Sequence, residues 1–161
     1  MSGFDRSAFH LARKGHYYDD FEPGRCFEHA FGRTLTEGDA VLFSTVTLAY
    51  TPMYLDAVQA AAAGHPSVVV NPMLVLTTVF GLSVEDLSEG GGLFLGMEAV
   101  RFLAFVYPGD TLRSRSTVVE RRESESRPTM GIVTWQTEGT NQRDETVIDF
   151  RRTNLVIKRG G

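Results

Sequence analysis

The segment from Asn71 to Gly81 is the most apolar stretch of this 161-residue chain, and it constrains the fold more than any other feature. Asn71 followed by Pro72 is typical of a helix N-cap and the first helical position, where proline is favoured. The β-branched residues of the stretch would equally suit a strand, but the cap signal favours a buried helix that runs to about Leu87. The rest of the chain then has to cover this helix.

Four long segments rich in β-branched and apolar residues follow the glycines at 90–92 and predict strands. These segments span about 93–105, 111–122, 131–142 and 147–158. Turn signals at 108–110 and 141–144 separate them, so we expect an antiparallel meander. Because helices and strands are segregated along the chain, the pattern indicates an α+β fold in which a long antiparallel sheet wraps around the central helix.

The N-terminal third is expected to hold one further strand. Residues 1–20 read as an arm or loop, and a strand is predicted over 25–35, with Cys26 as a small core residue. The length of the chain is typical of one domain, so 1–161 is interpreted as a single domain. A sheet of this size with one open face needs covering, so we expect at least a dimer.

Two capping signals predict helices between the first strand and the central helix. Thr36 with Asp39 resembles a capping box ahead of a short buried helix over 40–47. Asp56 is well placed to cap an alanine-rich helix that stops at Gly64, the alternative role for Asp56 being that of a base.

Composition narrows the class of function. Sixteen Lys and Arg against 20 Asp and Glu give a formal net charge of -4, which disfavours a nucleic-acid partner. The single cysteine cannot form an internal disulfide or a zinc cluster. His10, His16 and His29 show no metal-ligand spacing and are interpreted as structural or solvated, so no metal is expected. No apolar run reaches the ~18–20 residues that cross a bilayer, so we expect a cytoplasmic protein without a membrane partner.

Several motifs follow one another in a specific order and spacing. They are Tyr18-Asp-Asp-Phe-Glu-Pro-Gly24, Gly32-Arg-Thr-Leu-Thr-Glu37, Glu98-Ala-Val-Arg-Phe102, Pro108-Gly-Asp-Thr-Leu112, Arg122-Glu-Ser-Glu-Ser-Arg-Pro128, Gly131-Ile-Val-Thr134 and Phe150-Arg-Arg-Thr153. Together they resemble the MaoC-like, or (R)-specific enoyl-CoA hydratase, family of hotdog-fold proteins. The resemblance is greatest to the subgroup that acts on mesaconyl-CoA, β-methylmalyl-CoA and itaconyl-CoA.

The resemblance implies a single hotdog domain and an acyl thioester substrate carried by CoA or a carrier protein, with no cofactor of its own. It also implies a homodimer or higher oligomer, or a heterodimer with another hotdog chain. The family's reaction is reversible addition of water across the α,β double bond of the thioester. It requires a carboxylate or amide to orient water, a histidine to exchange a proton, and a backbone N–H to polarise the carbonyl.

The family carries the first two groups on a short loop that matches Thr47 to Asp56 here. In this register the water-orienting position is Ala49, which has no polar side-chain atom, and the histidine position is Tyr54. Thr51 stands where a second histidine is sometimes found. An ordinary tyrosine has a pKa near 10 and is a poor base at neutral pH.

The third group also departs from the family pattern. The residue pair at the start of the central helix aligns with Asn71-Pro72, and proline has no N–H to donate. The N–H of Met73 could replace it only if the substrate shifts. All three requirements of the ordinary hydratase reaction are therefore altered in one chain.

Each candidate residue of the site can be interpreted in two ways. Tyr50 and Tyr54, four residues apart, would share a face of a helical turn and form a new acid or hydrogen-bonding pair, or they fill the pocket. Thr51 orients a water or the thioester, or caps the turn. Asn71 holds the substrate or caps the helix. Arg101 anchors an acidic acyl tail or phosphates, or forms a surface salt bridge.

Two functions follow from these readings. The sequence favours a dehydratase-like or isomerase-like enzyme on an acyl thioester, with a rebuilt site that uses Tyr50, Thr51, Tyr54 and Asn71. The alternative is a catalytically inactive hotdog subunit that binds the acyl thioester and pairs with an active homologue. A ligand-binding or regulatory protein is a third, more remote reading.

Overall fold

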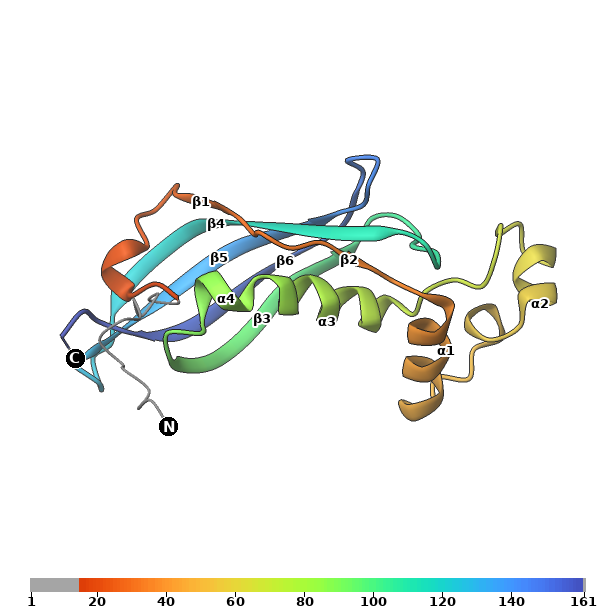
Figure 1. Cartoon of the computed structure of the whole chain (residues 1–161). Helices are drawn as coiled ribbons and strands as arrows, with labels where there is room; N and C mark the ends of the chain where they lie inside the picture. Colours follow the sequence, from red (N-terminus) through yellow and green to blue (C-terminus); the bar gives the residue numbers. More distant parts are fainter. Residues whose placement is uncertain (1–14, 161) are drawn as a thin grey trace, which may run out of the picture.

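The computed structural model describes residues 15–160 of the chain (Figure 1). The elements in chain order are the 3-10 helix η2 (Tyr18–Asp20), β1 (Cys26–Glu28), β2 (Arg33–Thr34), α1 (Glu37–Val46), the 3-10 helix η3 (Pro52–Tyr54), α2 (Ala57–Ala62), α3 (Pro72–Leu82), α4 (Val84–Leu87), β3 (Gly92–Phe102), β4 (Thr111–Glu123), β5 (Met130–Thr140) and β6 (Thr146–Ile157). Figure 1 shows a curved sheet with α3 and α4 along one face, while α1, η3 and α2 extend past one end of the sheet.

The four long predicted strands are confirmed, and their pairing is antiparallel throughout. The strand order is β1-β4-β5-β6-β3, and β2 pairs with the start of β4. The expectation that all four strands form one meander is wrong for β3, which lies beside β6 and not beside β4. This placement leaves the outer edge of β4 free to pair with β1 and β2, so the N-terminal strands can join the same sheet.

The predicted central helix is α3, and its cap is the predicted one. The Asn71 side chain accepts a hydrogen bond from the N–H of Met73, and Pro72 is the first helical residue. Val75 and Val79 face the sheet and are buried. The helix approaches β5 so closely that a Cβ built on Gly139 would lie 2.5 Å from the Val79 side chain. The helix breaks once, at Ser83, before α4 carries it to Leu87.

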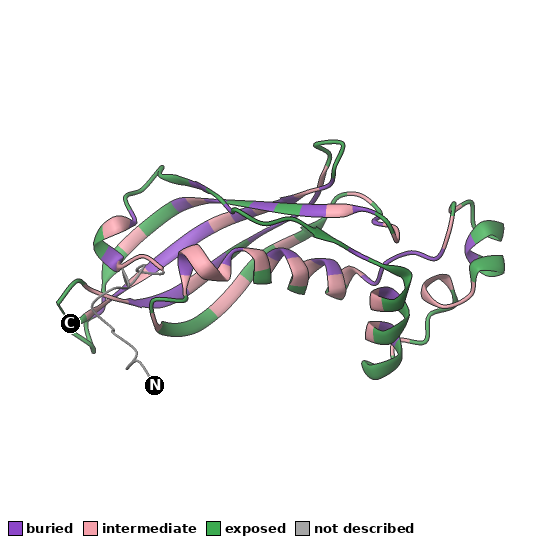
Figure 2. Ribbon diagram, viewed as in Figure 1, coloured by how far each residue is buried: buried purple, intermediate pink, exposed green. Residues whose placement is uncertain are grey.

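Two groups of buried residues form the core between helix and sheet. One surrounds Val75, Val79, Ile148 and Phe150 under α3. The other surrounds Phe21 and Trp135, whose rings meet edge to face at 4.9 Å. In Figure 2 the buried colour follows the middle strands of the sheet, whereas β3 and α1 are mostly exposed or intermediate. A long antiparallel sheet around one apolar helix is the α+β hotdog architecture expected from the sequence.

Three local expectations are wrong. The strand predicted over 25–35 is divided into two strands, β1 and β2. The chain advances five residues from Glu28 to Arg33, whereas the paired strand β4 advances only three residues, from Arg115 to Leu112. The surplus residues leave the sheet.

The helix predicted over 40–47 is α1, capped by Thr36 and Asp39 as expected, but it is largely exposed because it lies beyond the end of the sheet. Cys26 is exposed, because Phe27 takes the inward-facing position of β1. Residues 1–14 of the predicted arm, with His10, lie outside the described part. Within the described part, Tyr18 is buried in η2.

Candidate functional site

The loop after α1 turns back sharply to form one side of the candidate site. The Thr47 hydroxyl donates to the carbonyl of Phe43 at 2.6 Å, and the N–H of Ala49 donates to the carbonyl of Ser44 at 2.8 Å. Between them Leu48 adopts a left-handed backbone conformation with φ 58°, which costs a non-glycine residue roughly 1 kcal/mol. This reversal brings η3 back toward the start of α3.

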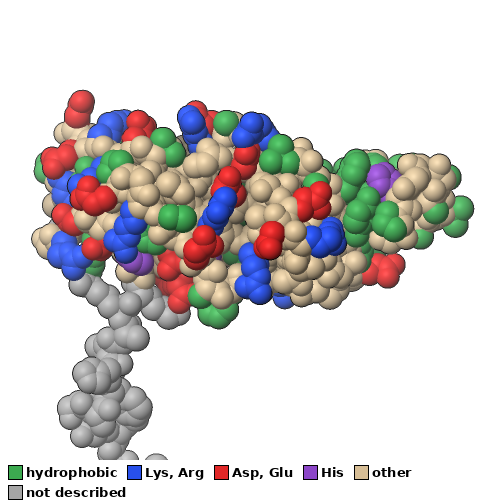
Figure 3. All heavy atoms as spheres, turned by 90° about the horizontal axis from the view of Figure 1, so that it is seen from above, with side chains coloured by type: hydrophobic (Ala, Val, Ile, Leu, Met, Phe, Trp, Pro, Cys, Tyr) green, Lys and Arg blue, Asp and Glu red, His purple; other side chains and the backbone are tan. Residues whose placement is uncertain are grey.

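An apolar pocket of about 210 Å³ opens between η3, the start of α3 and the segment that follows β3. Its lining residues are Met53, Tyr54, Val69, Val70, Pro72, Val75, Phe102, Leu103, Ala104, Phe105 and Val106. The Tyr54 hydroxyl is the one side-chain polar group among these residues. Figure 3 shows hydrophobic side chains gathered at the end of the molecule that carries α1 and α2, while charges of both signs cover the remainder of that face.

Backbone hydrogen bonds hold the walls of the pocket together. The N–H of Val69 donates to the carbonyl of Met53 at 2.8 Å, and the N–H of Val70 donates to the carbonyl of Val106 at 2.9 Å. The extended segment ahead of Asn71 is therefore fixed between η3 and the chain after β3. Because Asn71 then caps α3, the helix start is placed at the pocket by the same segment.

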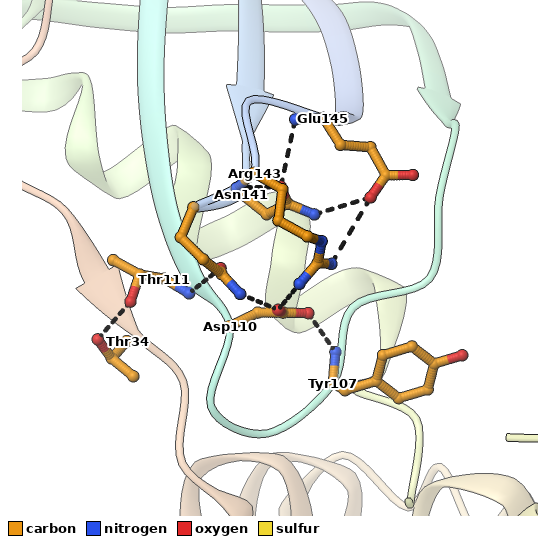
Figure 4. Close-up of polar contacts among 8 residues, drawn as sticks. Thr34, Tyr107, Asp110, Thr111, Asn141, Arg143 and Glu145 are labelled. Carbon is orange, nitrogen blue, oxygen red and sulfur yellow. Dashed lines mark hydrogen bonds and ion pairs between the residues drawn. The ribbon is translucent and has the colours of Figure 1, made fainter. Parts of the chain in front are cut away.

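A buried carboxylate anchors the turn that leads away from the pocket wall (Figure 4). Asp110 accepts hydrogen bonds from the N–H of Tyr107 at 2.9 Å, from Gln142 at 2.7 Å and from Arg143 at 3.2 Å. Asn141 closes the neighbouring hairpin by accepting from the backbone N–H groups of Arg143 and Glu145. The predicted turns at 108–110 and 141–144 thus brace each other next to the site.

Comparison with known proteins identifies the family of this chain. The family model described as mesaconyl-CoA hydratase matches residues 3–161. The chain belongs to this family. The mesaconyl-CoA hydratase of Haloarcula hispanica is 40% identical over 147 residues, which are 91% of this chain and 41% of that protein. The chain therefore spans less than half the length of this curated relative.

Solved structures support the same assignment. A MaoC domain protein of Chloroflexus aurantiacus superposes with a TM-score of 0.88 at 33% identity, over 94% of this chain and 43% of that one. A Mycobacterium tuberculosis protein described as having a double hotdog fold superposes with a TM-score of 0.78 at 29% identity, over 90% of this chain and 45% of that one. The hotdog fold and the MaoC-like family expected from the sequence are both confirmed.

In this member of the mesaconyl-CoA hydratase family, one of the three predicted catalytic residues reaches the pocket. Tyr54 lines it. Tyr50 is 60% exposed and Thr51 is also exposed, and neither lines the pocket. The helical turn expected to align Tyr50 with Tyr54 does not extend to Tyr50, because η3 begins only at Pro52. Ala49 is not among the lining residues either.

The start of α3 offers fewer free donors than the ordinary hydratase reaction requires. Pro72 has no N–H, and the N–H of Met73 donates to the Asn71 side-chain oxygen at 2.9 Å. The reading of Asn71 as a cap is confirmed, while its role in holding a substrate stays a prediction. To polarise a thioester carbonyl, Met73 would have to release this bond.

Arg101 forms a salt bridge, which is one of the two roles predicted for it. Its Nε donates to a carboxylate oxygen of Asp149 at 2.8 Å, and its Nη2 contacts the other oxygen. The hydrogen bond and charge of Asp149 raise the pKa of Arg101. Asp56 likewise acts as a cap: the backbone N–H groups of Gln59 and Val58 donate to it, and these bonds lower its pKa, which makes it a weaker base.

The structure also joins polar residues that sequence reasoning left apart. His29 is buried, with its Nδ1 2.6 Å from Asp86 and its Nε2 2.9 Å from the Ser116 hydroxyl, which contacts Thr137 at 2.9 Å. Because a carboxylate only accepts, Nδ1 donates to Asp86 and Nε2 accepts from Ser116 when His29 is neutral. Burial lowers the pKa of His29, against the opposing effect of Asp86.

Arg152, from the Phe150-Arg-Arg-Thr153 motif, is fully buried near His29. Its Nη1 donates to Ser83 at 2.9 Å, but Nε and Nη2 have no hydrogen-bond partner among residues 15–160. The guanidinium lies 4.7 Å from the Phe80 ring centre and 5.3 Å from that of Trp135. Burial lowers its pKa to about 10, so it stays charged at neutral pH.

Two further findings bear on the expected partners. Among residues 15–160, no three His, Cys, Asp or Glu side chains gather closely enough to hold a metal ion. None of the helices in that range has the length and apolar character needed to cross a membrane.

Proposed function

We propose that this chain is the acyl-binding hotdog of a MaoC-like hydratase or dehydratase that acts on a CoA thioester, with a second hotdog supplying the acid–base groups. The observation that carries the proposal is the pocket itself. It lies where the family's catalytic loop meets the central helix, yet its walls are aliphatic and aromatic apart from the Tyr54 hydroxyl.

Addition of water to an enoyl thioester needs a group that takes a proton from water and a group that delivers one to carbon. The described residues that line the pocket include no histidine, aspartate or glutamate. Loss of one acid–base group alone typically costs ~10²–10⁴-fold in rate. An acyl chain, by contrast, gains affinity from each apolar contact in such a pocket. The site therefore supports binding better than catalysis.

The edge strand β3 supports the existence of a second hotdog. Its outer side has no partner strand in the described chain, and Leu93, Phe94 and Leu95 are each about half exposed. Long exposed edges with apolar side chains invite pairing with another strand. The Haloarcula relative is more than twice as long as the matched region, and the Mycobacterium protein has two hotdogs, which supports a two-hotdog arrangement. A copy of this chain would carry the same Ala49, Thr51 and Tyr54, so the hotdog that supplies the acid–base groups is a different one.

One observation favours a second candidate, the rebuilt enzyme. Tyr54 stands at the histidine position of the loop and lines the pocket, so its hydroxyl is the group best placed to transfer a proton. In that case dehydration or double-bond isomerisation would depend on Tyr54 alone among the three predicted catalytic residues.

Turnover measured by mass spectrometry separates the two candidates. The substrates are C4–C5 enoyl-CoAs and 3-hydroxyacyl-CoAs, tested with the native chain, with Tyr54→Phe, and with a variant combining Ala49→Asn, Thr51→His and Tyr54→His. The proposal predicts a silent native chain and activity in the combined variant. Native activity that Tyr54→Phe abolishes, and that Tyr50→Phe leaves intact, would overturn it in favour of the rebuilt enzyme.

A further inference from the structure

The walls that this chain contributes to the pocket carry no charge, and this determines what kind of acyl tail they take. Its lining residues carry no lysine, arginine or histidine side chain. Part of the backbone is also engaged, because six of the lining residues donate their N–H groups to carbonyls of the chain. These residues are Tyr54, Val69, Val70, Val75, Leu103 and Ala104.

The cationic side chains that lie beside the lining residues, Arg101 and His65, are held by other partners. Arg101 precedes the lining residue Phe102 on β3, so their side chains point to opposite faces of the sheet. Arg101 is also held by the buried carboxylate of Asp149. His65 packs edge to face on Phe105, with ring centres 4.8 Å apart, and its Nδ1 lies 3.0 Å from the Tyr107 hydroxyl. No described cationic side chain is directed into the cavity.

We propose that this pocket selects a short, uncharged acyl chain and rejects acyl groups that end in a carboxylate. The inference rests on the proposed function, and it separates this chain from relatives named for mesaconyl-CoA, whose acyl group retains one free carboxylate. A carboxylate moved from water into such walls loses its hydration and gains no partner. An acyl chain that ends in a methyl group instead binds about fourfold more tightly for each methylene group that it buries.

The size of the cavity limits the length of the chain. A pocket of about 210 Å³ has room for a short acyl chain and not for a long one. Affinity is therefore expected to rise from butyryl-CoA to hexanoyl-CoA and to rise no further at decanoyl-CoA. A continued rise by a similar factor per methylene would contradict the stated length.

Binding of butyryl-CoA and succinyl-CoA to the full chain tests the exclusion of charge by isothermal titration calorimetry. The two acyl groups have the same number of carbons and differ in a terminal methyl against a terminal carboxylate. We expect butyryl-CoA to bind at least ~10-fold more tightly than succinyl-CoA, and more tightly than free CoA. Equal or tighter binding of succinyl-CoA would overturn this inference and leave the proposed function standing. If neither acyl-CoA binds better than free CoA, the proposed function itself fails.

A variant provides the converse test. Leu103 lines the pocket and is half exposed, so Leu103→Arg places a guanidinium at its mouth. The preference for butyryl-CoA over succinyl-CoA is expected to shrink by about tenfold or to reverse. Leu42→Arg is the matched control, because Leu42 is an exposed leucine of α1 outside the pocket lining, and it should keep the native preference. An unchanged preference in a folded Leu103→Arg would contradict the inference, and the native comparison decides alone if that variant does not fold.

Discussion

His29 and Arg152 are charged or chargeable side chains held in the core beneath α3 and α4, away from the acyl pocket. His29 bridges Asp86, just after the long helix, to Ser116 on β4. Arg152 joins β6 to Ser83, where that helix breaks. Both side chains therefore connect the helical layer to the sheet, and each leads to a different prediction about the free energy of unfolding.

The first prediction concerns acid. The folded state lowers the pKa of His29 below its ordinary value of about 6.5, so folding favours the neutral ring. The unfolded chain then binds more protons as the pH falls below about 6.5, and the free energy of unfolding should decline from that pH downward. Urea unfolding at pH 7.5 and at pH 5.5 measures the decline. His29→Gln should have a lower free energy of unfolding than the native chain at pH 7.5, but that free energy should fall less on acidification. An equal fall in both proteins would contradict the assignment.

The second prediction concerns Arg152, whose charge is buried with two nitrogen atoms unpaired. Replacing such a charge with an apolar side chain of similar length is often neutral or stabilising. Arg152→Met is expected to leave the free energy of unfolding unchanged or raise it by up to ~2 kcal/mol. Arg152→Ala, which leaves a cavity between Phe80 and Trp135, should lower it by ~2–4 kcal/mol. A large loss in Arg152→Met would mean that the ring contacts and the Ser83 bond outweigh the buried charge.

At the scale of elements, the turn at Asp110 is the clearest case of one side chain holding two segments together. Asp110→Ala leaves the N–H of Tyr107 and the side chains of Gln142 and Arg143 without their acceptor. We expect the free energy of unfolding to fall by ~2–4 kcal/mol. Glu138→Ala, which removes the partly exposed partner of the exposed Arg115, should cost less than ~1 kcal/mol. Similar losses in the two variants would show that the turn is not braced as described.

Local signals predicted the elements well. The Asn71-Pro72 cap, the Thr36–Asp39 capping box and the Asp56 cap are all present, because a cap depends on residues within one turn of each other. Alternation predicted the long strands for a similar reason. Neither signal reports partners distant in sequence, so the place of β3 beside β6 and the division of the first strand were not predictable.

The candidate site shows the same limit. The position of Tyr54 followed from the register of its loop, which is local. The exposure of Tyr50 did not, because it depends on where η3 begins after the chain reversal at Leu48. The contacts of His29 join residues 57 and 87 positions away, and no spacing rule links them. Arg152 was visible as part of a motif, but its burial required the fold.

For the whole molecule, β3 provides the prediction about assembly. If its free edge pairs with a second hotdog, a charge placed there should separate the two. Leu95→Lys is expected to lower the mass measured by light scattering to that of one chain, while Val119→Lys, on an exposed position of β4, should leave the mass unchanged. A native chain that already has the mass of one chain and does not associate with another hotdog would contradict the assembly.

The strand order also has a consequence for how the chain is made. During synthesis α3 and β3 emerge before β4, β5 and β6, and within the described chain β3 pairs with β6, the last strand to appear. The apolar edge strand β3 must therefore remain without its partner while β4 and β5 are translated. Over that interval the nascent chain presents a surface that chaperones recognise and that other chains aggregate on.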